Sequence, residues 1–214
     1  MTDRRRAREL ARRALERGDP TGWFEELYAG AREEADIPWA DLAPNPSLVE
    51  WLDAHAISGR ALKVGAGLGD DAEELARRGL AVTAFDVAPT AVDWARRRFA
   101  DSAVDYVVAD VLAPPPAWQA AFDFVLESYT LQVLPPALRP LAADAIAAML
   151  APGGTLLVIA RGRHPHEDAG AMPWPLTPDE VRDLFAGLRL VRFEDFLDDE
   201  DPPVRRLRAE YAVS

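Results

Sequence analysis

Apolar and polar positions alternate in blocks from residue 60 onward, where short apolar runs are separated by amphipathic stretches. Continuous apolar runs of this length read as buried strands, and the stretches between them carry helical spacing. Strands that alternate with helices favour a parallel sheet covered by helices on both faces. The pattern predicts strands over 61–64, 82–86, 105–109, 122–127 and 155–160, and helices over 71–78, 89–99 and 137–150.

The chain before residue 60 has no strand pattern. Helices are expected over 2–17, 22–31 and 47–55, with Thr21 and Ser47 as the caps of the second and third. A proline-punctuated loop is expected over 37–46.

After residue 160 the pattern changes again. A helix over 178–186 is followed by two extended runs, 188–197 and 204–213. The acidic link between these runs, 198–203, is short enough for a hairpin and reads as a solvated turn, so the last strand should be antiparallel.

The whole pattern predicts an α/β fold, a Rossmann-like doubly wound sheet of about seven strands. The sheet should be mostly parallel with an antiparallel last strand, and N-terminal helices precede it. No linker divides the chain, so we expect one domain over 1–214. Within it, 1–58 form a helical cap, 59–160 a cofactor-binding half, and 161–214 a substrate loop with the C-terminal strands.

Composition narrows the function. The net charge of −12 argues against a nucleic-acid binder, whose affinity comes from neutralising phosphates. The absence of cysteine excludes disulfides and thiolate metal sites, and it fits a cytoplasmic protein. No apolar run is long enough to predict a membrane span. We expect no metal, because His164 and His166 have no evident third ligand.

A glycine turn follows the first predicted strand, with glycines at positions 65, 67 and 69 and aspartates at 70 and 71. Such a turn lets the backbone approach a small ligand. A dinucleotide fingerprint requires glycine at position 70, and two carboxylates at the start of a helix repel a diphosphate. They suit a phosphate-free ligand with an ammonium and a sulfonium, as in S-adenosylmethionine. The alternative for Asp70 is a helix N-cap.

Two further aspartates end the next two strands. Asp86 stands 19 residues after Gly67 and is placed to accept both hydroxyls of a ribose. Asp110 is placed to receive an adenine amino group, with Val111 or Leu112 against the ring. A loop cap is the alternative for Asp86 and a turn residue the alternative for Asp110.

With these pieces in order, the chain resembles the class I S-adenosylmethionine-dependent methyltransferases. The resemblance rests on 64–69, 84–91, 108–110, 122–127, 130–134 and 150–156. It implies an enzyme that binds S-adenosylmethionine and methylates a small molecule. The cofactor-binding residues are then expected to be Trp39, Gly65, Ala66, Gly67, Asp70, Asp71, Asp86, Val87, Asp110, Val111, Leu112 and Glu127.

A narrower resemblance concerns the segments 38–49 and 69–79, which are similar to those of the thiopurine, thiol, halide and tellurite methyltransferases. It implies that Trp39 lies over the cofactor; packing of the N-terminal helices onto the sheet is the alternative. It also favours a thiol or another soft nucleophile as the methyl acceptor, reacting by in-line displacement.

Lys63 departs from the family pattern, in which an acid at this position helps to hold the cofactor's ammonium. We expect Lys63 to pair with Asp86, Glu127 or an N-terminal carboxylate. The cofactor's ammonium would then contact backbone carbonyls and Asp70 or Asp71.

The acceptor is expected beyond the fourth and fifth strands. Tyr129 and His164 are the candidate catalytic residues, against a core tyrosine and a surface histidine. Trp39, Tyr129, Arg161 and Trp174 are the candidate substrate-binding residues, and Arg161 would hold an anionic acceptor. The long proline-containing loop after residue 161 resembles a lid.

Two other functions compete. An NAD(P)-dependent reductase is disfavoured by the glycine spacing, by Asp70 and Asp71, and by the lack of a Tyr-x-x-x-Lys pair. A non-catalytic protein that binds the cofactor or a partner on the same fold is favoured by Lys63. The sequence does not separate a monomer from a homodimer.

Overall fold

The computed structural model describes residues 3–213 and confirms the predicted alternation. The helices are α1 (Asp3–Glu16), α2 (Gly22–Ala29), α3 (Pro46–Ala54), α4 (Asp70–Arg77), α5 (Pro89–Arg98), α6 (Arg139–Ala148) and α7 (Pro178–Leu184). The strands are β1 (Arg60–Val64), β2 (Ala81–Asp86), β3 (Asp105–Val108), β4 (Phe122–Ser128), β5 (Leu150–Arg161), β6 (Arg189–Leu197) and β7 (Arg205–Ala212). Short 3-10 turns lie at Glu34–Asp36, Pro116–Trp118, Leu131–Val133 and Pro136–Leu138.

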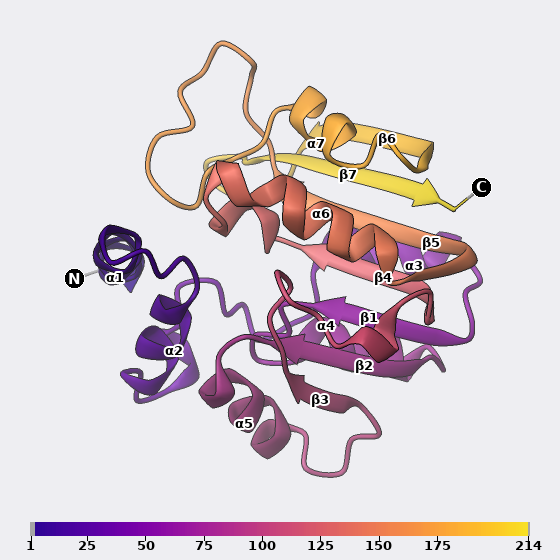
Figure 1. Ribbon diagram of the computed structural model, residues 1–214, viewed down its shortest axis with the longest axis horizontal. Helices are drawn as coiled ribbons and strands as arrows, with labels where there is room; N and C mark the ends of the chain where they lie inside the picture. Colours follow the sequence, from indigo (N-terminus) through magenta and orange to yellow (C-terminus); the bar gives the residue numbers. More distant parts are fainter. Residues whose placement is uncertain (1–2, 214) are drawn as a thin grey trace.

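The strands form one sheet in the order β3-β2-β1-β4-β5-β7-β6. Neighbours from β3 to β5 are parallel, whereas β7 runs antiparallel to both β5 and β6. The predicted fold class and the antiparallel last strand are therefore confirmed. Because β1 to β5 point the same way, their carboxyl ends meet at one edge of the sheet, on the left in Figure 1.

Helices cover both faces of the sheet. One face carries α3, α4 and α5, whose apolar side chains pack with Ala61, Phe124 and Leu126. The other face carries α6 and α7 over Leu62, Val64 and Val125. Alternate residues of β1 and β4 thus enter opposite cores, which explains the continuous apolar runs in the sequence.

Helices α1 and α2 lie beyond the carboxyl edge of the sheet rather than over a face (Figure 1). The apolar stripe of α1 packs on Trp23 and Leu27 of α2 and on Met172 of the loop after β5. Tyr28 of α2 joins Leu68 and Ala91 in a separate cluster. Of the predicted helical cap, α1 and α2 therefore lie over the edge at which the ligand was expected, whereas α3 covers a face of the sheet.

The structure corrects two predicted helix caps. Thr21 makes no side-chain cap; the Asp19 carboxylate instead accepts from the backbone N–H groups of Thr21 and Gly22. The N-cap of α3 is Asn45 rather than Ser47, and its side chain accepts from Ser47 N at 2.9 Å. In both cases a short carboxylate or amide upstream reaches the free N–H groups of the first turn better than the hydroxyl.

A third correction concerns the helix expected over 137–150. It ends at Ala148, because Leu150 already pairs with Phe122 as the start of β5. Strand pairing in the sheet therefore includes a residue that helical spacing alone assigned to the helix.

The acidic link between β6 and β7 is a built turn rather than only a solvated one. Asp198 accepts from Val204 N at 2.8 Å and from Glu200 N at 3.2 Å through its Oδ1 atom. Its Oδ2 atom accepts from Arg206 Nε at 2.6 Å. Asp198 therefore closes the hairpin and holds the guanidinium of Arg206 in place.

Arg208 of β7 joins the hairpin to α3. It is 6% exposed, donates to Ser47 O at 2.8 Å, and pairs with Glu194 at 2.6 Å and Glu50 at 3.1 Å. Its hydrogen bond holds the pKa of Glu194 below the usual range. The ionised Glu194 therefore stabilises the fold above its unfolded-state pKa of about 4.3, and this contribution is lost as the pH falls through its lower folded-state pKa.

Glu194→Gln is accordingly expected to lower the free energy of unfolding by about 2 kcal/mol near neutral pH, because a charge-assisted hydrogen bond is lost. Urea unfolding from about pH 7 down to about pH 3 checks this, since the gap between the proteins should close at the acid end. Glu16→Gln on exposed α1 is the control and should unfold like the parent protein. A gap that stays constant with pH would contradict the assigned ion pair.

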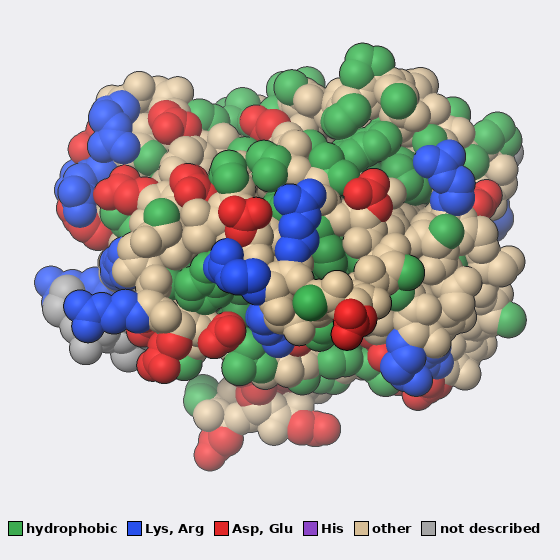
Figure 2. All heavy atoms as spheres, turned by 90° about the horizontal axis from the view of Figure 1, so that it is seen from below, with side chains coloured by type: hydrophobic (Ala, Val, Ile, Leu, Met, Phe, Trp, Pro, Cys, Tyr) green, Lys and Arg blue, Asp and Glu red, His purple; other side chains and the backbone are tan. Residues whose placement is uncertain are grey.

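The surface seen from below the view of Figure 1 carries basic and acidic side chains interspersed, with no continuous basic area on that face (Figure 2). Among residues 3–213, none of the helices has the length and apolar character needed to cross a membrane.

Candidate functional site

The glycine turn joins β1 to α4 at the carboxyl edge of the sheet. Gly65, Gly67 and Gly69 all have positive φ, at 65°, 53° and 97°. The turn closes on β2, because Ala66 N donates to Phe85 O at 2.7 Å. This conformation is open to glycine but strained for other residues. The three glycines leave the backbone uncovered, because the side chains of Ala66 and Leu68 between them are buried, and a flat ligand is able to approach it.

Asp86 ends β2 directly beside this turn. The carboxylate is 7% exposed and accepts from Gly67 N at 2.9 Å and from Ala88 N at 3.0 Å. Burial raises its pKa, and the two backbone N–H groups oppose that rise. Each carboxylate oxygen has one protein donor and so keeps a lone pair for a ligand hydroxyl. The geometry therefore fits a ribose at the carboxyl edge.

Asp110 and its neighbours lie after β3. Asp110 is half-buried, and its Oδ1 atom accepts from Leu112 N at 2.8 Å, so it does form the turn given above as its alternative. Its second oxygen is not used by that turn. Val111 is buried against the core, while Val87 and Leu112 are half-buried. A carboxylate oxygen suits the amino group of an adenine, and the apolar side chains beside it suit the adenine ring.

The two aspartates of the first turn of α4 have different protein partners. Asp70 forms a bidentate pair with Arg98 of α5, at 2.7 and 2.9 Å. Asp71 accepts from Asn45 N at 2.8 Å. The N-cap is Gly69, so the alternative of Asp70 as N-cap is wrong. Both carboxylates favour the helix start electrostatically, but Asp70 has its charge already paired.

Lys63 lies at the end of β1 with 3% exposure. Its ammonium donates to Val64 O at 2.8 Å and to Gly65 O at 3.0 Å, and Asp71 Oδ2 is 3.8 Å away. Lys63 therefore contacts backbone carbonyls of the glycine turn, with Asp71 as its nearest acid. The expected ion pair with Asp86 or Glu127 is not formed among the described residues, because the ammonium is held by these carbonyls instead. The positive charge of Lys63 also opposes the rise that burial causes in the pKa of Asp86 and of Glu127.

Glu127 of β4 is fully buried. Its Oε1 atom accepts from Thr130 N at 2.7 Å and from Leu131 N at 2.9 Å. Its Oε2 atom has no hydrogen-bond partner within the part of the chain that the structure describes. Burial raises the pKa of Glu127 to about 7, against the backbone donors and the charges of Lys63 and Arg139.

Three residues of this site were not among the candidates predicted from the sequence, although Asn45 and Thr130 lie in the segments 38–49 and 130–134 that carry the resemblances. Tyr28 of α2 reaches the turn, where its hydroxyl lies 3.4 Å from the position that a Cβ on Gly67 would take. Asn45 links Asp71 to Ser128 of β4. Thr130 donates to Val64 O at 3.2 Å. Each comes from an element that is distant in sequence from the glycine turn, so only the tertiary packing brings it here. For Tyr28, the sequence showed only its place in the apolar stripe of a predicted helix.

Trp39 lies next to Tyr28. Its Nε1 atom donates to the Tyr28 hydroxyl at 3.0 Å, and its ring meets Trp23, Phe24 and Tyr28 edge-on. It is 36% exposed. The tryptophan thus packs on the N-terminal helices and also lies one side chain away from the glycine turn, so both expectations for it remain compatible with its position.

The expected acceptor residues gather around the ends of β4 and β5. Tyr129 has a positive φ of 64°, a strained conformation of the kind found at functional sites. The guanidinium of Arg206 lies 5.3 Å from the centre of its ring. Burial raises the pKa of Tyr129, and Arg206 opposes this. Tyr129 is half-buried at the edge of the site.

Arg161 follows β5 in the same region. It is half-buried, and Gln132 Oε1 accepts from its backbone N–H at 2.8 Å. Among the described residues, its Nε atom has no hydrogen-bond partner and its guanidinium no carboxylate within ion-pair distance. Burial and the charges of Arg206 and Arg4 lower its pKa. An arginine in this state is stabilised by any anion that binds beside it.

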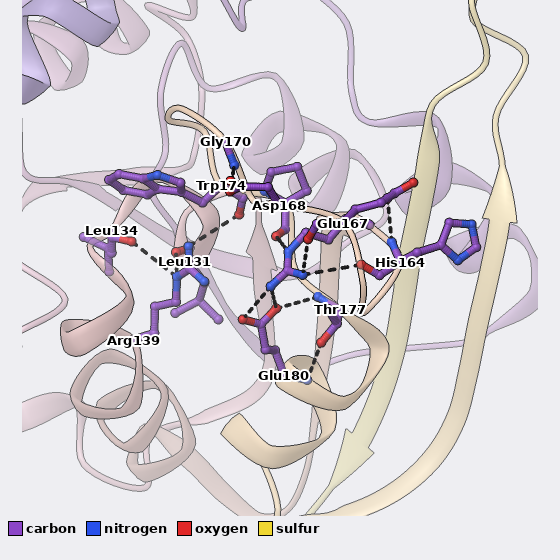
Figure 3. A network of polar contacts seen from close by, with 12 residues as sticks. Leu131, Leu134, Arg139, His164, Glu167, Asp168, Gly170, Trp174, Thr177 and Glu180 are labelled. Atoms are coloured by element: carbon purple, nitrogen blue, oxygen red, sulfur yellow. Dashed lines mark hydrogen bonds and ion pairs between the residues drawn. The ribbon is translucent and has the colours of Figure 1, made fainter.

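The loop between β5 and α7 holds the remaining candidates (Figure 3). Trp174 N donates to Gln132 O at 2.8 Å, and Trp174 O accepts from the buried Arg139. His164 is exposed and stacks on His166. Figure 3 shows the His164 ring pointing away from Trp174 and Arg139, toward the C-terminal strands. The loop thus brings Trp174 inward and leaves His164 at the rim.

Comparison with known proteins agrees with this geometry. The family described as "Methyltransferase domain" matches residues 61–154, from β1 to the start of β5. The 2-heptyl-1-hydroxyquinolin-4(1H)-one methyltransferase of Mycobacteroides abscessus is 27% identical over 75% of this chain and 73% of its own length. Probable thiol methyltransferase 2 of Arabidopsis thaliana is 27% identical over 72% of this chain and 67% of its own length.

Solved structures show the same fold. One described as "Conversion of a Disulfide Bond into a Thioacetal Group during Echinomycin Biosynthesis" has a TM-score of 0.76 and 25% identity, with 91% of this chain and 93% of the other covered. The N-methyltransferase NodS of Bradyrhizobium japonicum, in complex with S-adenosyl-L-homocysteine, has a TM-score of 0.70 and 23% identity, with 91% and 98% covered.

One conclusion follows from the matched family, from these relatives, and from a glycine turn whose backbone and aspartates fit an adenosine ligand. The chain is an S-adenosylmethionine-dependent methyltransferase of a small molecule, and it has the fold of the class I enzymes.

Proposed function

We propose that this methyltransferase transfers the methyl group to the sulfur of a small-molecule thiol, which reacts as its thiolate. The observation that carries the proposal is Arg161, a half-buried arginine at the end of β5 with an unpartnered Nε and no carboxylate partner among the described residues. Such a group favours an anionic acceptor. The name of the plant relative, a probable thiol methyltransferase, supports sulfur as the acceptor atom.

The cofactor's place is part of the proposal. The adenosine end would lie on Gly65, Ala66 and Gly67, with Asp86 on the ribose hydroxyls. The same placement would put the adenine base between Asp110 and the side chains of Val87, Val111 and Leu112. It would also put Trp39 above the ligand, on the far side of Tyr28. Asp71 at the start of α4 would add a negative charge that suits a positive sulfonium, whereas the charge of Asp70 is paired with Arg98.

When bound, S-adenosylmethionine supplies an electrophilic methyl group. The positive charge of Arg161 lowers the pKa of an acceptor thiol, so that its proton leaves to water and the thiolate is held. Tyr129, fixed beneath Arg206, orients the acceptor. Trp39 and Trp174 exclude water from the two sides. The bond from sulfur to methyl forms as the old sulfur–methyl bond breaks.

A thiolate acceptor does not require a protein base. The base role expected for His164 therefore stays a prediction for acceptors that must lose a proton during transfer. An acidic hydroxyl is the second acceptor class, because the same arginine stabilises an oxygen anion and one relative is named for a 1-hydroxyquinolone substrate.

A matched panel of arylthiol, phenol and aniline acceptors tests the proposal, with S-adenosylhomocysteine formation as the readout. The arylthiol should turn over fastest. Arg161→Gln should lower kcat for it by about tenfold or more near pH 7, since about 1.5–3 kcal/mol of charge interaction is lost. The acid limb of the kcat profile should also move to higher pH, because the bound thiol ionises less readily.

Arg192→Gln is the matched control, because Arg192 is an exposed arginine on β6 that pairs with Glu194. It should leave both kcat and its pH profile unchanged. Aniline turnover above arylthiol turnover, or an Arg161→Gln profile that overlies that of the parent enzyme, would contradict the proposed acceptor.

A further inference from the structure

The amino-acid end of the cofactor has to meet protein charges at the end of β1, and the obvious partners there are already engaged. Asp70 is paired with Arg98 through both oxygens. The carbonyls of Val64 and Gly65 already accept from the ammonium of Lys63. An α-ammonium that bound these same carbonyls would stand beside a buried lysine, where like charges repel. The partner for that ammonium must therefore be sought elsewhere.

Lys63 has binding capacity left. An ammonium carries three N–H donors, and two are used by the carbonyls of Val64 and Gly65. The nearest carboxylate, Asp71 Oδ2, stands at 3.8 Å, beyond hydrogen-bond length. A buried cation with an unused donor is stabilised by a carboxylate that comes into contact with it.

Glu127 offers the opposite charge on the neighbouring strand. In the register of β1 and β4, Glu127 lies beside Val64, so it flanks the end of β1 from the other side. It is 0% exposed, and its Oε2 atom has no partner among residues 3–213. An unpartnered, buried carboxylate oxygen is destabilising by itself and becomes favourable when a cation binds it.

We propose that Lys63 and Glu127 form a clamp for the zwitterionic end of the cofactor, in which Lys63 binds the α-carboxylate and Glu127 binds the α-ammonium. This inference rests on the cofactor placement given under Proposed function. It assigns the ammonium to Glu127 rather than to the carbonyls and aspartates that the sequence suggested. Lys63 then becomes a specificity residue for ligands that carry a carboxylate.

The clamp couples binding to protons. The pKa of Glu127 is raised to about 7 by burial, while Lys63 of β1, Arg139 of α6 and the N–H groups of Thr130 and Leu131 act against that rise. Contact with an ammonium favours the ionised form. Binding should therefore release about half a proton at pH 7, and the affinity should rise about tenfold from about pH 6 to about pH 8.

Isothermal titration calorimetry with two ligands tests the clamp. S-adenosylhomocysteine carries the zwitterionic end, and 5′-methylthioadenosine lacks it but keeps the adenosine. Lys63→Met and Glu127→Gln should each weaken S-adenosylhomocysteine binding by about tenfold, and each should leave 5′-methylthioadenosine within about twofold of its parent affinity. Glu127→Gln should also abolish the pH dependence. Lys63→Arg should retain more affinity than Lys63→Met.

The parent protein alone gives a second test that needs no variant to fold. Titration at pH 7 in two buffers of different ionisation enthalpy should show the proton release with S-adenosylhomocysteine and none with 5′-methylthioadenosine. Equal or tighter binding of S-adenosylhomocysteine by Lys63→Met, with 5′-methylthioadenosine still bound, would overturn the clamp alone. Failure of the parent protein to bind either ligand would overturn the cofactor placement and the clamp together.

Discussion

Asp86→Asn is expected to weaken S-adenosylhomocysteine binding by about 100-fold. The carboxylate keeps one lone pair on each oxygen after accepting from Gly67 N and Ala88 N. Two charge-assisted hydrogen bonds to ribose hydroxyls would use them, and together they are worth about 3 kcal/mol, which corresponds to about 100-fold in Kd. Asparagine has nearly the same shape but no charge and only one acceptor oxygen, so it loses most of this. Calorimetry with S-adenosylhomocysteine measures the change.

Asp123→Asn is the matched control for Asp86→Asn. Asp123 also accepts from a backbone N–H group, that of Arg60 at 2.8 Å, but it lies at the amino end of β4 and away from the candidate site. Binding by this control should equal that of the parent protein. The thermal midpoint of each variant separates lost binding from lost folding. An Asp86→Asn variant that folds and binds within about threefold of the parent would remove Asp86 from the ribose.

Gly65→Ala is expected to lower the free energy of unfolding by about 3 kcal/mol and to abolish cofactor binding. Gly65 has a φ of +65°, and a Cβ built there lies 2.4 Å from Thr130 Oγ1. Left-handed backbone costs a non-glycine residue about 1–2 kcal/mol, and the overlap adds an amount of similar size. Thr130 is not free to move without losing its bond to Val64 O. Urea unfolding and calorimetry measure the two effects.

Gly79→Ala separates the two contributions. Gly79 also has a positive φ, +93°, but a Cβ there meets nothing within 4 Å. This control should lose only about 1 kcal/mol of stability and keep full cofactor binding. In the Gly65→Ala background, Thr130→Ala removes the colliding oxygen and should restore part of the stability. Equal losses for Gly65→Ala and Gly79→Ala would show that the overlap with Thr130 has no energetic weight.

The sequence alone was sufficient for the architecture. The spacing of apolar residues along one segment reflects which of its side chains are buried. Apolar runs of strand length therefore located β1 to β5, and stretches with helical spacing located the helices between them, to within a few residues at most boundaries. The glycines before α4 and the aspartates at the ends of β2 and β3 were also readable, because strand ends in a parallel sheet share one edge. The exceptions were local. The side chains of Asp19 and Asn45, not those of Thr21 and Ser47, accept from the first N–H groups of α2 and α3, and β5 began before helical spacing ended.

Only the tertiary structure decided which charges at that edge remain available to a ligand. Asp70 and Asp71 look alike in the sequence, yet Arg98, 28 residues along the chain, pairs with the first, while Asn45 donates to the second. Lys63 and Glu127 lie on neighbouring strands 64 positions apart, and no pattern in either strand indicates that one keeps a spare donor and the other a free oxygen. Periodicity reports burial along one segment, whereas the state of a buried charge depends on which distant side chains reach it.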